Sequence, residues 1–276
     1  MAPKPDETKL IHLEVLIYGI FKRYGYDFSG YNAASLERRV SLFCDQLQFA
    51  RISQLVDPVL NDPQIFRRFI DYITIPVTAM FRDPSFYRAL ADQVLPRLAS
   101  YPHFKVWHAG CANGAEAFSL AILLESNNLL KRALIYGTDI NNTELSFAKK
   151  AIFSASQIEE YTPNYRQVSE EGSLQDFFLS RGNASILKHE LRQNITFAKH
   201  NLAVDHSFAE VNLILCRNVM IYFDQKLRNR VLQLFHDSLA RKGYLCLGSS
   251  ESLVSSEHQN LFELVDPKNQ IYRRTS

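Results

Sequence analysis

The stretch VWHAGCANGAEAFSLA, residues 106–121, decides the fold of this chain. An apolar run leads into a turn that contains Gly110 and Gly114, and the turn opens into an apolar helix. A strand, a glycine turn and a helix N-terminus together form a nucleotide-binding element, because glycines let the backbone approach a ligand and free N–H groups point towards it. The alternative is an ordinary strand–helix turn.

The chemistry around this turn favours an adenosyl ligand without a pyrophosphate. The dinucleotide spacing G-x-G-x-x-G would need glycine in place of Ala112, which disfavours hydride chemistry with a nicotinamide cofactor. Glu116, in the first helical turn, repels phosphate and suits an ammonium or hydroxyl group. Asp139 ends the next predicted strand, and its carboxylate can accept both hydroxyls of a ribose.

Composition excludes several classes of protein. The chain has 276 residues with 31 basic and 29 acidic side chains, so its net charge does not indicate a nucleic-acid partner. Four dispersed cysteines without a CxxC pair indicate reduced thiols and give no metal site. The polar first nine residues do not resemble a signal peptide, and no apolar run is long enough to insert into a membrane. We therefore expect a cytoplasmic protein, by default a monomer.

Residues 1–75 are predicted to form an all-helical N-terminal domain. Its four helices are expected at residues 10–24, 33–49, 53–60 and 62–72, with Asn32 capping the second. The second helix carries Arg38 and Arg39. These two side chains form either a solvated helix face or a docking face for an acidic or helical partner.

Residues 76–276 alternate between helices and strands, which predicts a doubly wound, mostly parallel α/β sheet. Strands are expected at 104–107, 134–138, 211–216 and 243–247, helices at 84–98, 142–151 and 225–240, and a closing hairpin at 261–264 and 270–273. Ligands bind beyond the carboxyl ends of such strands, where Arg217 and Asn218 also lie. Short strands at 185–187 and 195–197 predict a small antiparallel β-flap at about 183–198.

Six segments occur in an order that resembles a known family. They are ITIPVTAMFRDPSFY (73–87), VWHAGCANGAEAFS, YGTDI (136–140), HNL (200–202), LILCRNVMIYFD (213–224) and GYLCLGSSE (243–251). The chain resembles, over nearly its whole length, the CheR-type chemotaxis protein-glutamate O-methyltransferases. The resemblance implies a Rossmann-like class I methyltransferase fold. It also implies methyl transfer from S-adenosylmethionine, leaving S-adenosylhomocysteine, to glutamates in the cytoplasmic domain of chemoreceptors, for signal transduction in chemotaxis.

The resemblance also implies roles for individual residues. Tyr222 matches the tyrosine near the transferred methyl group, and the basic N-terminal helix with Arg38 and Arg39 is expected to meet the receptor. Residues matching the family's cofactor-binding positions are Thr78, Arg82, Gly110, Glu116, Asp139, Asn201, Leu202, Arg217 and Asn218.

Three segments depart from the family pattern. Pro76 stands where many members have asparagine, which removes an N–H and a side-chain amide. The glycine turn reads GCANGAE rather than GCSTGEE, so a hydroxyl pair and one carboxylate are missing. The flap segment GNASILKHE (182–190) is short, which implies independence of a C-terminal receptor peptide tether.

The implied chemistry needs no general base, because a glutamate is already ionised near pH 7. No Ser/His/Asp or Cys/His constellation stands out in the sequence. Two alternatives remain: a methyltransferase for another signalling-protein acceptor, and a non-catalytic receptor-docking module that keeps the fold.

Overall fold

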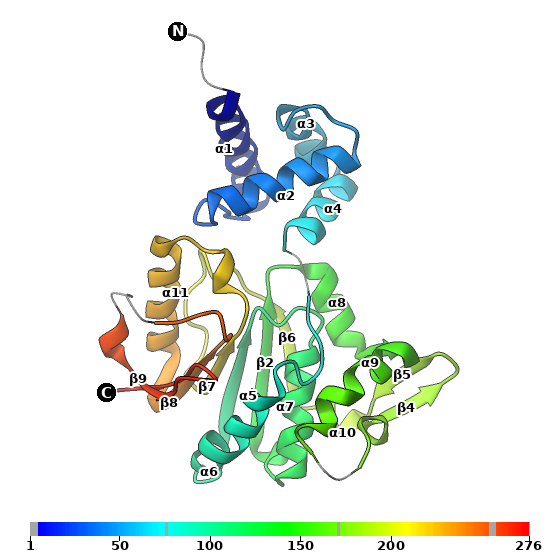
Figure 1. Ribbon diagram of the computed structural model, residues 1–276, viewed down its shortest axis with the longest axis vertical. Coiled ribbons are helices and arrows are strands. Elements are labelled where there is room, and N and C mark those ends of the chain that lie inside the picture. Colours follow the sequence, from blue (N-terminus) through cyan, green and yellow to red (C-terminus); the bar gives the residue numbers. More distant parts are fainter. Residues whose placement is uncertain (1–4, 75–76, 170–171, 254–257, 276) are drawn as a thin grey trace. The chain divides into compact units, whose positions relative to one another are not determined.

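The computed structural model describes residues 5–74, 77–169, 172–253 and 258–275 (Figure 1). The chain divides into two compact units. The first unit comprises Met1–Ile75, Asn201–Asp205 and Tyr222–Val231, and the second comprises Pro76–His200, His206–Ile221 and Leu232–Ser276. The predicted domain boundary between residues 75 and 76 lies outside the described residues. In the described part of the chain, no helix combines the length and the apolar character needed to cross a membrane.

The N-terminal part of the first unit is helical. Its helices are α1 (Pro5–Tyr24), α2 (Ala33–Gln46), α3 (Ser53–Asn61) and α4 (Pro63–Thr74). Asn32 caps α2, because its side-chain oxygen accepts a hydrogen bond of 3.1 Å from the N–H of Ser35. Helix α2 ends before the predicted Phe49, since Gln48 has a φ of 57° that breaks the helical path.

Arg39 does not lie on the docking face that the sequence suggested. Arg39 is only 4% exposed. Its Nη1 donates to the carbonyl of Ile73 at 2.7 Å, and its guanidinium lies 4.2 Å from the ring centroid of Tyr222. Arg38 is exposed. Neighbouring residues on a helix point about 100° apart, so the two arginines cannot share one face. Only Arg38 remains a candidate for docking.

A seven-stranded sheet in the order β6-β2-β1-β7-β8-β10-β9 forms the centre of the second unit. Strands β6, β2, β1, β7 and β8 are parallel, and β10 is antiparallel to both β8 and β9. The predicted doubly wound, mostly parallel sheet with a closing hairpin is therefore confirmed. The strands are β1 (Phe104–Ala109), β2 (Ala133–Asp139), β6 (Ile195–Lys199), β7 (Val211–Cys216), β8 (Leu239–Leu247), β9 (Phe262–Asp266) and β10 (Ile271–Arg274).

Helix α7 (Ala115–Ser126) is buried on nearly all sides, so it holds the glycine turn that precedes it in a fixed position. From Ala115 to Leu124, every residue except Glu116 is buried. The predicted helix at 84–98 contains a π-helical turn, Leu90–Val94, between α5 (Pro84–Ala89) and α6 (Leu95–Leu98). The remaining α-helices are α8 (Asn142–Lys150), α9 (Ala155–Arg166), α10 (His189–Arg192) and α11 (Gln225–Ser238).

A small antiparallel sheet in the order β3-β5-β4 forms the flap, beside α9 in Figure 1. Its strands are β3 (Ile152–Ser154), β4 (Phe178–Arg181) and β5 (Ala184–Leu187). The prediction that residues 195–197 belong to this flap is wrong, because they lie in β6 and pair in parallel with β2. Phe197 packs onto Gly137 of β2, where a Cβ would lie 2.6 Å from its ring, so this contact requires glycine.

Candidate functional site

The glycine turn after β1 is tied to the two strands that flank it. The N–H groups of Gly110 and Cys111 both donate to the carbonyl of Thr138 in β2, at 2.8 and 2.9 Å. Gly110 has a φ of 81°, and a Cβ at this position would lie 2.4 Å from Cγ2 of Val219, which follows β7. Both the backbone conformation and the close approach therefore require glycine here.

Gly110→Ala is expected to destabilise the fold and to weaken adenosyl-ligand binding. The left-handed conformation costs about 1–2 kcal/mol for alanine, and the contact with Val219 adds a steric clash. Calorimetric melting of Gly110→Ala and of Gly110→Ala/Val219→Ala separates the two effects. The double variant is expected to recover only the part of the melting temperature that the clash with Val219 removes. Equal melting temperatures for wild type and Gly110→Ala would contradict this account.

Asp139 ends β2 and faces the same turn. Its Oδ2 accepts from the N–H of Ala112 and its Oδ1 from the N–H of Asn141, both at 2.9 Å. Burial raises the pKa of this carboxyl, against the opposing effect of N–H donors from Asn141, Ala112 and Ile140. A carboxylate offers about four lone-pair sites, so at least one remains for a ribose hydroxyl.

The carboxylate of Glu116, in the first turn of α7, contacts one side chain from β1 and one from the loop after β7. Its Oε1 lies 2.9 Å from Nδ1 of the fully buried His108 in β1, and its Oε2 lies 3.4 Å from Nη1 of Arg217, which follows β7. Burial acts to raise the pKa of Glu116, but the contacts with His108 and Arg217 outweigh burial and lower it. Glu116 is therefore a fixed negative charge beside the turn.

The stability that Glu116 contributes is expected to be lost in acid. Because its pKa is lower in the folded chain, its contribution is complete above its unfolded pKa and disappears as the pH falls through the folded value. Glu116→Gln is expected to cost about 1.5–3 kcal/mol near pH 7. The difference from wild type should shrink as the pH falls below about 4.3, as measured by denaturant unfolding between pH 3 and 7. A difference that stays constant over this range would rule out the proposed charge contact.

Arg217 is buried between two carboxylates and an aromatic ring. Its Nη2 lies 2.6 Å from Oδ2 of Asp83, and its guanidinium lies 4.0 Å from the ring centroid of Phe86. The side chain is only 3% exposed. Desolvation alone would lower the pKa of Arg217, but the charge of Glu116, with smaller effects of Tyr87 and Asp83, raises it. Arg217 therefore stays charged and connects the glycine turn to the start of α5.

Glu251 is a functional candidate that the sequence reasoning did not identify. Asn218 follows Arg217 with a φ of 62°, a conformation uncommon for a residue other than glycine. The buried carboxylate of Glu251 holds this loop, because it accepts from the N–H groups of Asn218, Val219, Ile221 and Gly248 at 2.6–3.2 Å. An acidic residue shortly after a predicted strand, in GSSE, was the available signal.

Thr78 and Arg82 lie in the segment before α5. Thr78 is half-buried. Arg82 donates from Nη1 to the carbonyl of Val77 at 3.0 Å, and its own carbonyl accepts from Nη1 of Arg217 at 3.4 Å. Asp83 therefore pairs with Arg217 rather than with its neighbour Arg82. Pro76, the departure from the family pattern, lies outside the described residues.

Three of the residues predicted for cofactor binding and catalysis belong to the first unit. Asn201 is buried, and its side-chain oxygen accepts from the N–H of Ala203 at 3.0 Å. Leu202 is also buried. The carbonyl of the half-buried Tyr222 accepts from the N–H of Asn32 at 2.8 Å. Their placement at a bound cofactor stays a prediction.

The described geometry of the second unit gathers five predicted residues at one edge of its sheet. They lie at or just beyond the carboxyl ends of strands β1, β2 and β7, and are Gly110, Glu116, Asp139, Arg217 and Asn218. One carboxylate in the first turn of α7 and one at the end of β2 disfavour a phosphate and suit a ligand that presents an ammonium and ribose hydroxyls. These donors and acceptors fit an adenosyl amino acid.

Comparisons with known proteins identify both parts of the chain. Residues 76–271 match the family model "CheR methyltransferase, SAM binding domain", and residues 11–74 match "CheR methyltransferase, all-alpha domain". A "Putative methyltransferase Cher3" of Pseudomonas putida is 41% identical over 96% of this chain and 97% of its own length. A "Chemotaxis protein methyltransferase" of Listeria innocua is 31% identical over 87% of this chain and 89% of its own length. The cofactor of the matched domain is S-adenosylmethionine.

Proposed function

Because the chain belongs to the CheR methyltransferase family, we propose that it methylates glutamate side chains of chemoreceptors and forms glutamate methyl esters. The observation that carries the proposal is the match of both family domains together with the acids Glu116 and Asp139 at the glycine turn. Relatives named chemotaxis protein methyltransferases support the choice of acceptor.

The chain's own residues hold the reactants rather than move protons. Bound S-adenosylmethionine supplies an electrophilic methyl group on a sulfonium centre. Asp139 is proposed to hold ribose hydroxyls, while Glu116 attracts the ammonium of the methionine part. Thr78, Arg82, Asn201, Leu202, Arg217 and Asn218 are proposed to line the rest of the cofactor site.

Orientation is proposed to supply most of the catalysis. The acceptor carboxylate is ionised at neutral pH, so it needs no general base. Holding its oxygen in line with the methyl group, in a site without water, can contribute about 7–11 kcal/mol. Tyr222 is proposed to be the catalytic residue that donates a hydrogen bond to this carboxylate, since a neutral donor orients the oxygen without protonating it.

Tyr222→Phe tests this role. Loss of one hydrogen bond of about 1.4 kcal/mol predicts roughly tenfold slower turnover. Because the phenyl ring remains, affinity for S-adenosylhomocysteine should stay near the wild-type value in calorimetry. Equal turnover of the two proteins would remove Tyr222 from the mechanism.

The proposed function is tested by incubating the protein with methyl-labelled S-adenosylmethionine and the cytoplasmic domains of chemoreceptors. The expected product is a receptor carrying a base-labile methyl ester. Cofactor binding without receptor methylation would indicate another signalling-protein acceptor. Receptor binding without cofactor binding would indicate a docking module.

The proposed setting is cytoplasmic, with the exposed Arg38 contributing to receptor docking and the protein acting as a monomer. The short turn between β4 and β5, which contains Gly182, leaves little length for gripping a receptor's C-terminal peptide. We therefore propose docking that does not depend on such a tether. Methylation that is unchanged when the receptor's C-terminal peptide is deleted is the expected result.

A further inference from the structure

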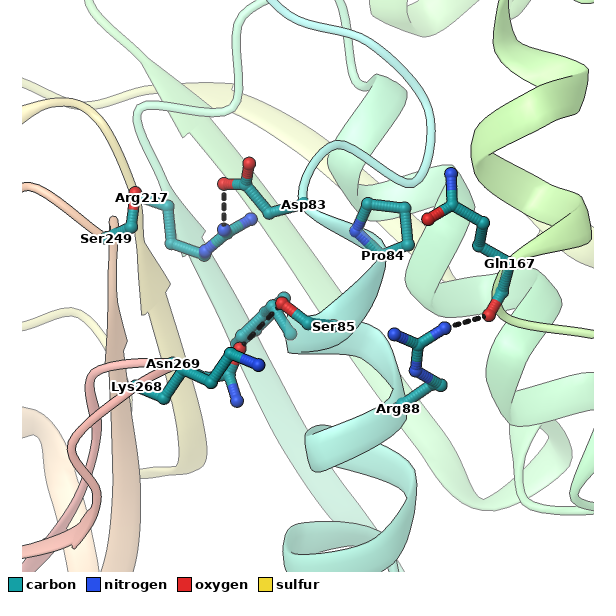
Figure 2. A pocket seen from close by; sticks show the side chains of 10 residues that line it. Asp83, Pro84, Ser85, Arg88, Gln167, Arg217, Ser249, Lys268 and Asn269 are labelled. Carbon is teal, nitrogen blue, oxygen red and sulfur yellow. Dashed lines mark hydrogen bonds and ion pairs between the residues drawn. The ribbon is translucent and has the colours of Figure 1, made fainter.

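A pocket of about 410 Å³ lies beside Arg217, within the second unit (Figure 2). The start of α5 forms one wall, and residues after β7 and β8 together with the β9–β10 turn form others. The polar residues that matter most are Asp83, Ser85, Arg88, Arg217, Lys268 and Asn269. Asp139, the proposed ribose-binding residue at the end of β2, does not line this pocket.

The charge of the pocket lining is positive. Arg88, Arg217 and Lys268 contribute three cations, and Asp83 contributes one carboxylate, which pairs with Arg217 at 2.6 Å. Arg88 donates to the carbonyl of Gln167 at 2.5 Å, and in the described part of the chain neither Arg88 nor Lys268 has a carboxylate within ion-pair distance. Two cations at the rim are therefore available to an anionic ligand.

Both rim cations sit on ordered backbone. The N–H groups of Lys268 and Asn269 donate to Oδ1 of Asp266 at 2.9 and 3.0 Å, which shapes the β9–β10 turn. The hydroxyl of Ser85 donates to Oδ1 of Asn269 at 3.0 Å and ties this turn to α5 (Figure 2). Asp266 itself is engaged by these donors and by the amide of Asn269 at 2.7 Å. The backbone that carries Lys268 is therefore held in place, and the side chain of Arg88 is held by the carbonyl of Gln167.

The position of the pocket indicates which reactant it meets. The sheet order places β2 on one side of β1, and β7 and β8 on the other. Asp139 is the last residue of β2, whereas Arg217 and Ser249 in the pocket follow β7 and β8. Arg217 reaches both sites, because its guanidinium contacts Glu116, in the first turn of α7 beside the glycine turn, and Asp83 of the pocket wall. The pocket thus adjoins the cofactor turn on the side away from the ribose.

We propose that this pocket binds an acidic segment of the acceptor protein, with Arg88 and Lys268 pairing with carboxylates that neighbour the methylated glutamate. The proposal rests on the proposed function, because it assigns the pocket to the acceptor of methyl transfer. Exposed cations at the rim of a pocket act mainly on the rate of association with the acceptor and on its KM. Their effect falls as the salt concentration rises.

The first test compares Arg88→Gln, Lys268→Gln and the double variant with wild type in steady-state receptor methylation. Each change is expected to raise the KM for the receptor about 3- to 5-fold, the upper range for exposed ion pairs, and the double variant should lose part of the salt dependence. Arg97→Gln is the matched control, because Arg97 is an exposed arginine in α6 that does not line the pocket. An unchanged KM in the double variant would overturn the proposal.

Calorimetry with S-adenosylhomocysteine shows whether the pocket belongs to the acceptor site or to the cofactor site. All three variants are expected to bind this product with wild-type affinity, and a tenfold loss would mean that the pocket belongs to the cofactor site.

A second test does not require receptor methylation, so it stands even if the proposed function fails. Hexaglutamate is titrated into protein loaded with S-adenosylhomocysteine at low salt. We expect binding that weakens at least 5-fold in the double variant and stays unchanged in Arg97→Gln. No binding, or inorganic phosphate that binds as well as hexaglutamate, would overturn the assignment to an acidic segment.

Discussion

Glu251→Ala is expected to lower the free energy of unfolding by about 3–5 kcal/mol, because it removes a buried carboxylate and leaves four backbone N–H groups without their acceptor. In the folded chain the carboxylate accepts from Asn218, Val219, Ile221 and Gly248. Alanine can replace none of these bonds, and the left-handed backbone at Asn218 loses its support. Denaturant unfolding at pH 7 measures the change.

The control for this variant is Glu263→Ala. Glu263 is a glutamate of the same second unit whose side chain is 55% exposed and pairs with Arg273 at the surface. Its removal is expected to change stability by less than about 1 kcal/mol. The account of Glu251 would be contradicted if both variants lost the same small amount, since the buried carboxylate would then contribute no more than a surface charge.

Asp139→Ala is expected to weaken the binding of S-adenosylhomocysteine about 100-fold or more. One hydrogen bond between a carboxylate and a ribose hydroxyl contributes about 1.5–3 kcal/mol. The same carboxylate also holds the N–H of Ala112, whose φ is 44°, so the glycine turn loses an anchor as well. Isothermal titration at pH 7 gives the affinity directly.

Asp139→Asn separates these two contributions. The amide keeps one acceptor oxygen but has no charge, so an intermediate loss of roughly tenfold is expected. Asp237→Asn, at an aspartate whose side chain is 56% exposed, serves as the control and should bind normally. Affinity within twofold of wild type for Asp139→Ala would show that Asp139 does not hold the ribose.

Much of the second unit follows from patterns that are local in the sequence. The apolar run Val211–Cys216 forms a buried strand, and the turn with Gly110 and Gly114 joins β1 to α7 as predicted. The carboxyl ends of parallel strands meet at one edge of the sheet, so Glu116, Asp139 and Arg217 were expected to gather there. The contacts of Glu116 and Asp139 described above lie at this edge.

Other features depend on partners that are distant in the sequence. The short apolar segment Ile195–Phe197 suits a flap as well as a sheet edge, and only its pairing with β2 over Gly137 decides between them. Arg39 is an ordinary helix arginine in the sequence, yet the carbonyl of Ile73 and the ring of Tyr222 bury it. Helical periodicity does not tell which face a later segment will cover.

The sequence by itself determined the alternation of helices and strands in the second unit, the glycine turn and the acids that flank it, because these depend on periodicity and on turn chemistry within a few residues. The tertiary structure alone decided that Glu251 holds the loop after β7, that His108 faces Glu116, and that Arg88 and Lys268 share a pocket. These contacts join residues from separate strands and turns, and packing in three dimensions brings them within hydrogen-bond distance or into one cavity.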